Sequence, residues 1–254
     1  MKPLLALDFD GVLCDSAPEN AATSWRVCQR LWPRQFAGDG IPAAQIERFC
    51  AIRPYMETGY QSILMTKLMW DGAPEAEYTT DFAALLPRLL ARYALTKEQL
   101  VAEFGAERDR WLAQDEAGWL SYNRFYPGVP EVVRELLARS RALIVTTKET
   151  RFVLRLFAQA GIAFPEADVF GLERKRKKEA ILQDFADGGE HAFVAFVEDR
   201  LATLQRVIAV PALARVRLGF AQWGYTTPAQ RDEAARTPGI RLLDAPADLP
   251  EMLA

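Results

Sequence analysis

Short runs of apolar residues recur along the chain, and most are followed by segments with the spacing of amphipathic helices. Near-continuous apolar runs are typical of strands that are buried on both faces of a parallel sheet. Their alternation with helices predicts an α/β fold with a doubly wound, mostly parallel, Rossmann-like sheet. The predicted strands cover residues 4–9, 142–146, 167–171, 192–198, 215–220 and 240–243. The helices predicted between them include 129–140, 151–160 and 178–185.

The stretch of residues 16–125 breaks this alternation. It contains no convincing buried strand, but it holds several aromatic-rich amphipathic segments separated by prolines. We therefore expect an α/β core domain formed by residues 1–15 and 126–254, with a helical domain formed by residues 16–125 inserted after the first strand. The helices predicted in this insert cover residues 19–31, 43–53, 59–69, 81–94 and 96–114.

Composition excludes several classes of protein. The 254 residues include 31 lysines and arginines against 34 acidic residues, a formal charge of −3, so no basic surface for nucleic acid is expected. No apolar run approaches the roughly 20 residues that span a membrane, and the N-terminus is too short for a signal peptide. The three cysteines have neither metal-ligand nor disulfide spacing, which predicts a cytoplasmic location.

His191 is the only histidine, and it lies in a loop-like segment before an apolar run. A catalytic histidine or a site with several histidine ligands is therefore not expected. Acid–base chemistry in this protein would have to use carboxylates or lysines.

The first predicted strand ends in two carboxylates separated by one residue, Asp8 and Asp10, followed by Gly11. Ligands bind beyond the carboxyl ends of strands in open parallel sheets. Two crowded carboxylates repel each other unless a cation neutralises them, and Mg²⁺ prefers such oxygen ligands. The alternative is a helix N-cap and a turn aspartate without a metal.

Polar residues also follow two other predicted strands. Thr146 and Thr147, followed by Lys148, could bind phosphate oxygens at a strand-to-helix turn, although threonines also cap helices. Glu198 and Asp199 form a second acidic pair at an equivalent strand end, where Asp199 could instead start the next helix. Two acidic strand ends in one sheet favour a metal site over two independent caps.

The basic run 174–178 stands just before a predicted apolar helix. Five cations at the positive end of a helix are unfavourable unless solvent or a bound anion compensates them. Most of this run is expected to be solvated surface. We expect one lysine to bind phosphate, with Lys178 favoured over Lys177 and Lys175.

Together these segments resemble the haloacid dehalogenase-like (HAD) hydrolase superfamily. The resemblance covers the sheet domain from residue 4 to about residue 243, and the insert only by its position. Tyr126-Pro-Gly-Val129 and Trp223-Gly-Tyr225 are similar to segments of phosphoglycolate-phosphatase-like members. The four family motifs are matched by Asp8-Phe-Asp-Gly11, Leu143-Ile-Val-Thr146, Lys178 and Glu198-Asp199.

The resemblance implies a Mg²⁺-dependent phosphatase that hydrolyses a small phosphorylated metabolite through an aspartyl-phosphate. Asp8 would be the nucleophile, and Asp10 the acid and base. The metal ligands would be Asp8, the backbone carbonyl of Asp10 and Asp199, with Glu198 orienting a bound water or contacting the metal itself. The phosphate ligands implied by the resemblance would be Thr146 and Lys178, and Thr147 is a further candidate from its place after the second strand. The fourth motif departs from the common Gly-Asp or Asp-Asp because glutamate comes first, which affects the expected metal shell.

The position of the insert resembles that of a helical cap in related enzymes. Such a cap would exclude water before phosphoryl transfer. The expected specificity residues are Arg53, Tyr55 and Glu57, in a proline-containing segment with charges of both signs. An ordinary loop between helices is an equally good interpretation of that segment.

Other functions are possible on the same scaffold. A phosphomutase would need the cap to hold and reorient a sugar phosphate, and a non-catalytic protein could bind a phosphorylated metabolite. A dehalogenase is disfavoured because Asp10 supplies an acid–base carboxylate that dehalogenases lack. A phosphonate hydrolase would need a Schiff-base lysine in the insert, where Lys67 and Lys97 are the only lysines.

Overall fold

The computed structural model describes residues 1–254, which form two compact units. The core unit comprises Met1–Asp15 and Phe125–Ala254, and the helical unit comprises Ser16–Arg124. None of the helices combines the length and the apolar character needed to cross a bilayer.

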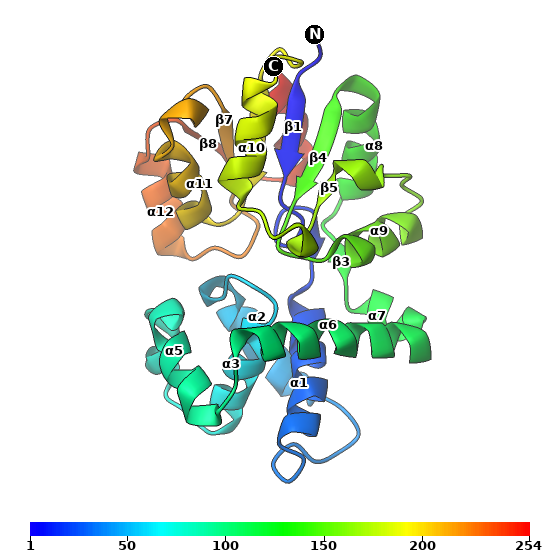
Figure 1. Ribbon diagram of the computed structural model, residues 1–254, viewed down its shortest axis with the longest axis vertical. Helices are drawn as coiled ribbons and strands as arrows, with labels where there is room; N and C mark the ends of the chain where they lie inside the picture. Colours follow the sequence, from blue (N-terminus) through cyan, green and yellow to red (C-terminus); the bar gives the residue numbers. More distant parts are fainter. The chain divides into compact units, whose positions relative to one another are not determined.

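The core unit is built on a six-stranded sheet with the strand order β5-β4-β1-β6-β7-β8 (Figure 1). Every neighbouring pair of strands is parallel. The predicted α/β fold and its six strands are therefore confirmed. In chain order the strands are β1 (Leu4–Leu7), β4 (Arg141–Val145), β5 (Val169–Phe170), β6 (Val194–Glu198), β7 (Arg217–Ala221) and β8 (Ile240–Leu243). Two further strands, β2 (Cys14–Asp15) and β3 (Arg124–Phe125), pair in a separate two-stranded sheet.

Helices cover both faces of the large sheet, because its central strands carry apolar side chains on both. Every residue of β1 is fully buried. Leu4 and Ala6 pack in one cluster with residues of α10 and α11, whereas Phe9 contacts Phe157 of α9. The helices of this unit are α8 (Val129–Arg139), α9 (Thr150–Gln159), α10 (Lys178–Asp187), α11 (Leu201–Ile208) and α12 (Pro228–Arg236). The short 3₁₀ helices are η2 (Glu166–Asp168), η3 (Leu172–Arg174), η4 (Pro211–Leu213) and η5 (Pro246–Leu253).

The strand order places a topological switch point beside β1. The chain passes from β1 to β4 on one side and later returns to β6 on the other side. Leu7 is in register with both Ile144 of β4 and Val197 of β6. The carboxyl ends of these three strands therefore lie together, at the place where open α/β sheets bind ligands.

The helical unit packs around its own apolar core. Trp25 of α1 contacts the rings of Phe36 and Trp70 edge-on, and both Trp25 and Phe36 are buried. The helices are α1 (Ala17–Leu31), α2 (Ala43–Ile52), η1 (Arg53–Tyr55), α3 (Gln61–Trp70), α4 (Glu75–Thr79), α5 (Phe82–Tyr93), α6 (Lys97–Gln114) and α7 (Glu116–Ser121).

A buried ionic cluster also links the helices of this unit. Glu19 of α1 is fully buried and accepts two hydrogen bonds from Arg108 of α6, at 2.8 and 2.5 Å. Thr23 Oγ1 and Trp119 Nε1 also donate to the Glu19 carboxylate. A buried charge of this kind is tolerated because its oxygens are paired and hydrogen-bonded.

Candidate active site

Three carboxylates converge at the switch point. Asp8 follows β1, Glu198 ends β6, and Asp199 comes next in the chain. The Asp8 N–H donates to Val197 O at 3.0 Å, so the backbone of β1 holds Asp8 level with the end of β6. One oxygen from each carboxylate lies within 4.8 Å of the others, and all three residues are buried.

Lys178, the first residue of α10, faces two of these carboxylates. Its Nζ lies 2.9 Å from Asp8 Oδ1 and 2.7 Å from Glu198 Oε2. The rest of the basic run is exposed, and Arg176, in the loop before α10, pairs with Asp184 of that helix. Of the three lysines expected as phosphate ligands, the structure therefore places Lys178 in the site and leaves Lys175 and Lys177 on the surface.

Burial and mutual repulsion disfavour the charged forms of these acids. Burial, together with the charge of Glu198, raises the pKa of Asp8 to about 7. Burial and the charge of Asp8 raise the pKa of Asp199 to about 6. Burial alone would lower the pKa of Lys178, but the charges of Asp8 and Glu198 raise it. One lysine thus does not neutralise the cluster.

The cluster fits a hard divalent cation. Its donors are carboxylate oxygens, which Mg²⁺ prefers, and three negative charges face a single lysine. Asp8 Oδ1 is within ion-pair distance of Lys178 but accepts no well-aligned hydrogen bond, although it is buried. Both Glu198 oxygens have protein partners, since Oε1 accepts the Arg200 N–H at 3.1 Å and Oε2 pairs with Lys178. The Asp10 side chain does not belong to this cluster.

The loop that follows β7 closes over Asp199. The Tyr225 N–H donates to Asp199 Oδ2 at 2.6 Å, and the Tyr225 hydroxyl lies 2.8 Å from Asp15 Oδ1. Trp223 Nε1 donates to the carbonyl of Val12 at 3.0 Å. The segment Trp223–Tyr225, which the sequence marked only by its resemblance to other family members, therefore contacts both Asp199 and the loop after β1.

This packing requires glycine at two positions. A Cβ on Gly11, whose φ is +89°, would lie 1.9 Å from Asp199 Oδ2. A Cβ on Gly224 would lie 2.3 Å from Asp199 Cβ and 2.4 Å from the carbonyl oxygen of Gly11. Neither neighbour of Gly224 is the end of a flexible side chain, so an added methyl group must displace Asp199 or the first loop.

We expect Gly224→Ala to weaken Mg²⁺ binding by about 10- to 100-fold, the range seen when residues that orient metal ligands are changed. Titration calorimetry of the full chain with Mg²⁺ measures this directly. Gly188→Ala is the matched control, because Gly188 lies at the end of α10 with an ordinary φ of −66°. Unchanged Mg²⁺ affinity in Gly224→Ala would contradict a metal site formed by Asp199 together with the first loop.

The second predicted motif lies at the end of β4. Thr146 is buried, and its Oγ1 accepts the Lys148 N–H at 3.1 Å, whereas Thr147 is half-buried. Lys148, which the sequence did not single out as a site residue, is buried, and its Nζ lies 3.1 Å from Asp10 Oδ1. The side chain of Asp10 is thus paired with Lys148 and not with the acidic cluster.

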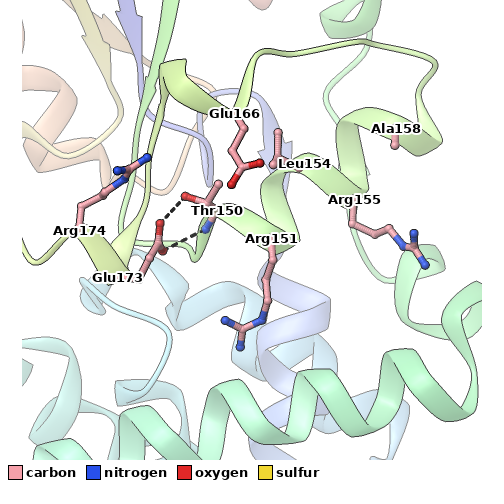
Figure 2. A pocket seen from close by; sticks show the side chains of 8 residues that line it. All are labelled: Thr150, Arg151, Leu154, Arg155, Ala158, Glu166, Glu173 and Arg174. Atoms are coloured by element: carbon pink, nitrogen blue, oxygen red, sulfur yellow. Dashed lines mark hydrogen bonds between the residues drawn. The ribbon is translucent and has the colours of Figure 1, made fainter.

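Glu173 connects the loops that carry Thr146 and Lys178. Its carboxylate accepts hydrogen bonds from the N–H (3.2 Å) and the hydroxyl of Thr150 at the start of α9 (Figure 2). The Leu172 N–H donates to the Lys148 carbonyl at 3.1 Å. A cleft of about 830 Å³ lies beside this contact, lined in part by Arg151, but no residue of the acidic cluster lines it. Thr150 is the only buried polar residue that lines this cleft, so the acidic cluster is the better candidate for the active site.

The expected specificity residues lie in and after η1 of the helical unit. Arg53 is buried and donates from Nη1 to the Met56 carbonyl at 2.8 Å. Tyr55 packs against the apolar core of this unit, and the Glu57 N–H donates to Gln61 Oε1 at 2.7 Å. Their role in specificity stays a prediction.

Comparison with known proteins identifies the class. The haloacid dehalogenase-like hydrolase family model matches residues 3–205, and the chain belongs to this family of hydrolases. No curated protein matches the sequence significantly.

Solved structures of low sequence identity share the fold over nearly the whole chain. A predicted phosphoglycolate phosphatase from Haemophilus somnus is 16% identical with a TM-score of 0.59, and covers 99% of this chain and 97% of its own. A predicted phosphatase from Clostridium acetobutylicum is 15% identical with a TM-score of 0.59, covering 100% and 99%. A haloacid dehalogenase-like hydrolase from Streptococcus pneumoniae is 13% identical with a TM-score of 0.57, also covering 100% and 99%.

Proposed function

We propose that this hydrolase is a Mg²⁺-dependent phosphomonoesterase that acts on a small phosphorylated metabolite through an aspartyl-phosphate on Asp8. The observation that carries the proposal is the cluster of three buried carboxylates facing Lys178, with Asp10 two residues after Asp8. Phosphoryl transfer depends mainly on alignment and on neutralising spread negative charge. Two of the structurally similar proteins are described as predicted phosphatases, which also supports this proposal.

Asp8 and Asp199, with the Asp10 backbone carbonyl, would hold the metal, which when bound supplies positive charge against the phosphate oxygens. Lys178 supplies a further positive charge beside Asp8, and Glu198 holds Lys178 in place through its 2.7 Å contact. Thr146 and Thr147 would donate to the phosphate from the end of β4. These contacts offset the repulsion between the Asp8 carboxylate and an anionic substrate.

The reaction would proceed in two displacements at phosphorus. A carboxylate oxygen of Asp8 attacks the phosphorus, the bond to the leaving oxygen breaks, and Asp10, which enters this step as the protonated carboxylic acid, gives that oxygen its proton. A water molecule then attacks the same phosphorus, Asp10 takes its proton, and the bond between phosphorus and Asp8 breaks. The products are the free alcohol and inorganic phosphate.

We also propose that the helical unit acts as a cap that excludes water and selects the substrate through Arg53, Tyr55 and Glu57. Its insertion directly after Asp15, between the first motif and the rest of the core unit, supports this role. The three cysteines are free thiols, in keeping with a reducing compartment, and we place the enzyme in the cytoplasm.

A phosphate-release assay of the full chain against para-nitrophenyl phosphate and a panel of phosphorylated metabolites tests the proposal. We expect turnover with Mg²⁺, and its loss with EDTA and recovery on adding Mg²⁺. Tight binding of a phosphorylated compound without turnover would favour a non-catalytic binding protein. Conversion of a sugar phosphate to its isomer without phosphate release would favour a phosphomutase.

A further inference from the structure

Lys148 is a buried cation to which the reaction above gives no role. Its side chain is 0% exposed, and its Nζ lies 3.1 Å from Asp10 Oδ1. Burying an ammonium group costs several kcal/mol unless a partner compensates it, so an apolar side chain would fill the same space at lower cost. The position of this charge against the Asp10 carboxylate therefore indicates a functional role.

The backbone of Lys148 is held on both sides. Its N–H donates to Thr146 Oγ1 at 3.1 Å, and its carbonyl accepts the Leu172 N–H at 3.1 Å. The Nζ also lies 5.9 Å from the centre of the Phe9 ring, within range of a cation–π contact. A side chain fixed at its backbone and enclosed along its length presents its ammonium group as a rigid donor.

Asp10 lies in the turn that follows β1, next to Gly11 with its positive φ, and its side chain is only partly enclosed at 15% exposure. A carboxylate that transfers protons must be held close to its productive geometry. The pairing with Lys148 restricts the rotation of the Asp10 side chain.

We propose that Lys148 is a positioning residue: it donates to Oδ1 of the Asp10 carboxyl group, so that the other carboxyl oxygen carries the proton and is held in the orientation needed to transfer it to the leaving oxygen. This inference rests on the proposed phosphatase function. Two other roles for Lys148 predict different behaviour: direct binding of the substrate phosphate, and a contribution to stability alone.

The dependence on the leaving group separates these roles. An alkyl phosphate has a poor leaving group and needs the proton from Asp10, whereas 2,4-dinitrophenyl phosphate does not. The parameter to compare is kcat/KM, because it reports the steps up to formation of the aspartyl-phosphate. Lys148→Met should lower kcat/KM about 10- to 100-fold for the alkyl phosphate, and less than about 3-fold for the aryl phosphate. Lys177→Met, a change of an exposed lysine that the structure leaves outside the site, should alter neither.

A double-mutant cycle tests whether Lys148 acts through Asp10. In an Asp10→Asn background, Lys148→Met should cause no further loss with the alkyl phosphate, because the group it orients is already gone. Lys148→Gln, which keeps a hydrogen-bond donor on a side chain one bond shorter, should recover part of the activity lost in Lys148→Met. It also serves as the second variant if the methionine variant folds poorly, as judged by circular dichroism.

Equal losses on both substrates, or a further loss in the Asp10→Asn background, would overturn this role of Lys148 while leaving the phosphatase function intact. No Mg²⁺-dependent turnover by the wild-type chain on either substrate would overturn the proposed function, and the role of Lys148 with it.

Discussion

Replacing Asp8 by asparagine is expected to lower kcat by at least about 10⁴-fold, because a neutral amide cannot attack phosphorus as a carboxylate does. The two side chains have nearly the same shape, so the buried site keeps its packing. Burial and the charge of Glu198 already disfavour the ionised form of Asp8, and removing that charge relieves repulsion among three acids. The melting temperature should therefore stay the same or rise.

Steady-state phosphate release and thermal denaturation measure these two effects together. Asp187→Asn makes the same chemical change at an exposed position on α10 and should leave both quantities unchanged. Asp8→Ala is a useful second variant, since it cannot revert to aspartate by deamidation. Turnover within about 10-fold of the wild type in Asp8→Ala would rule out Asp8 as the nucleophile.

The largest effect on stability is expected from Arg108→Met in the helical unit. Arg108 makes two hydrogen bonds to Glu19 and one, at 2.8 Å, to Asn20 Oδ1. Its removal leaves the fully buried Glu19 carboxylate without a compensating charge. Breaking one side of a buried ion pair costs about 3–5 kcal/mol of unfolding free energy. Urea denaturation followed by tryptophan fluorescence measures the change, with Arg88→Met at an exposed site as the control.

Replacing both partners separates the cost of an orphaned charge from the loss of packing. Glu19→Met combined with Arg108→Met should recover part of the stability lost in the single variant, because no unpaired charge remains buried. A loss below about 1 kcal/mol in Arg108→Met would show that the Glu19 carboxylate reaches water or another partner. An equal or greater loss in the double variant would show that packing, not charge, dominates.

The four inner strands of the main sheet, β4, β1, β6 and β7, could be predicted because burial on both faces demands unbroken apolar runs, as in Leu4–Leu7. The strands β2 and β3 have only two residues each, and each pairs one polar residue with one apolar residue, so neither forms an apolar run. Helix α12 was also missed, since only Ala234 of its residues is buried and no apolar face marks it. Short or solvated elements depend on tertiary contacts that local pattern does not reveal.

The convergence of Asp8 with Glu198 and Asp199 was predictable for a different reason: parallel strands end at the same edge of the sheet. The pairing of Lys148 with Asp10 was not, because it depends on where a long side chain turns after β4 ends. The contact from Tyr225 to Asp199 uses a backbone N–H, which any residue could supply, so side-chain identity gives no signal for it. Only the Trp223–Tyr225 resemblance pointed to that loop.

The central claim is that Asp8 carries the phosphoryl group during turnover. Rapid acid quenching of the full chain during hydrolysis, followed by proteolysis and mass spectrometry, tests this most directly, because an aspartyl-phosphate survives brief exposure to acid. We predict phosphate on the peptide that contains Asp8, present with substrate and Mg²⁺ and absent after Asp8→Asn. An enzyme that releases phosphate at full rate, with no phosphate found on Asp8 at any quench time, would contradict the claim.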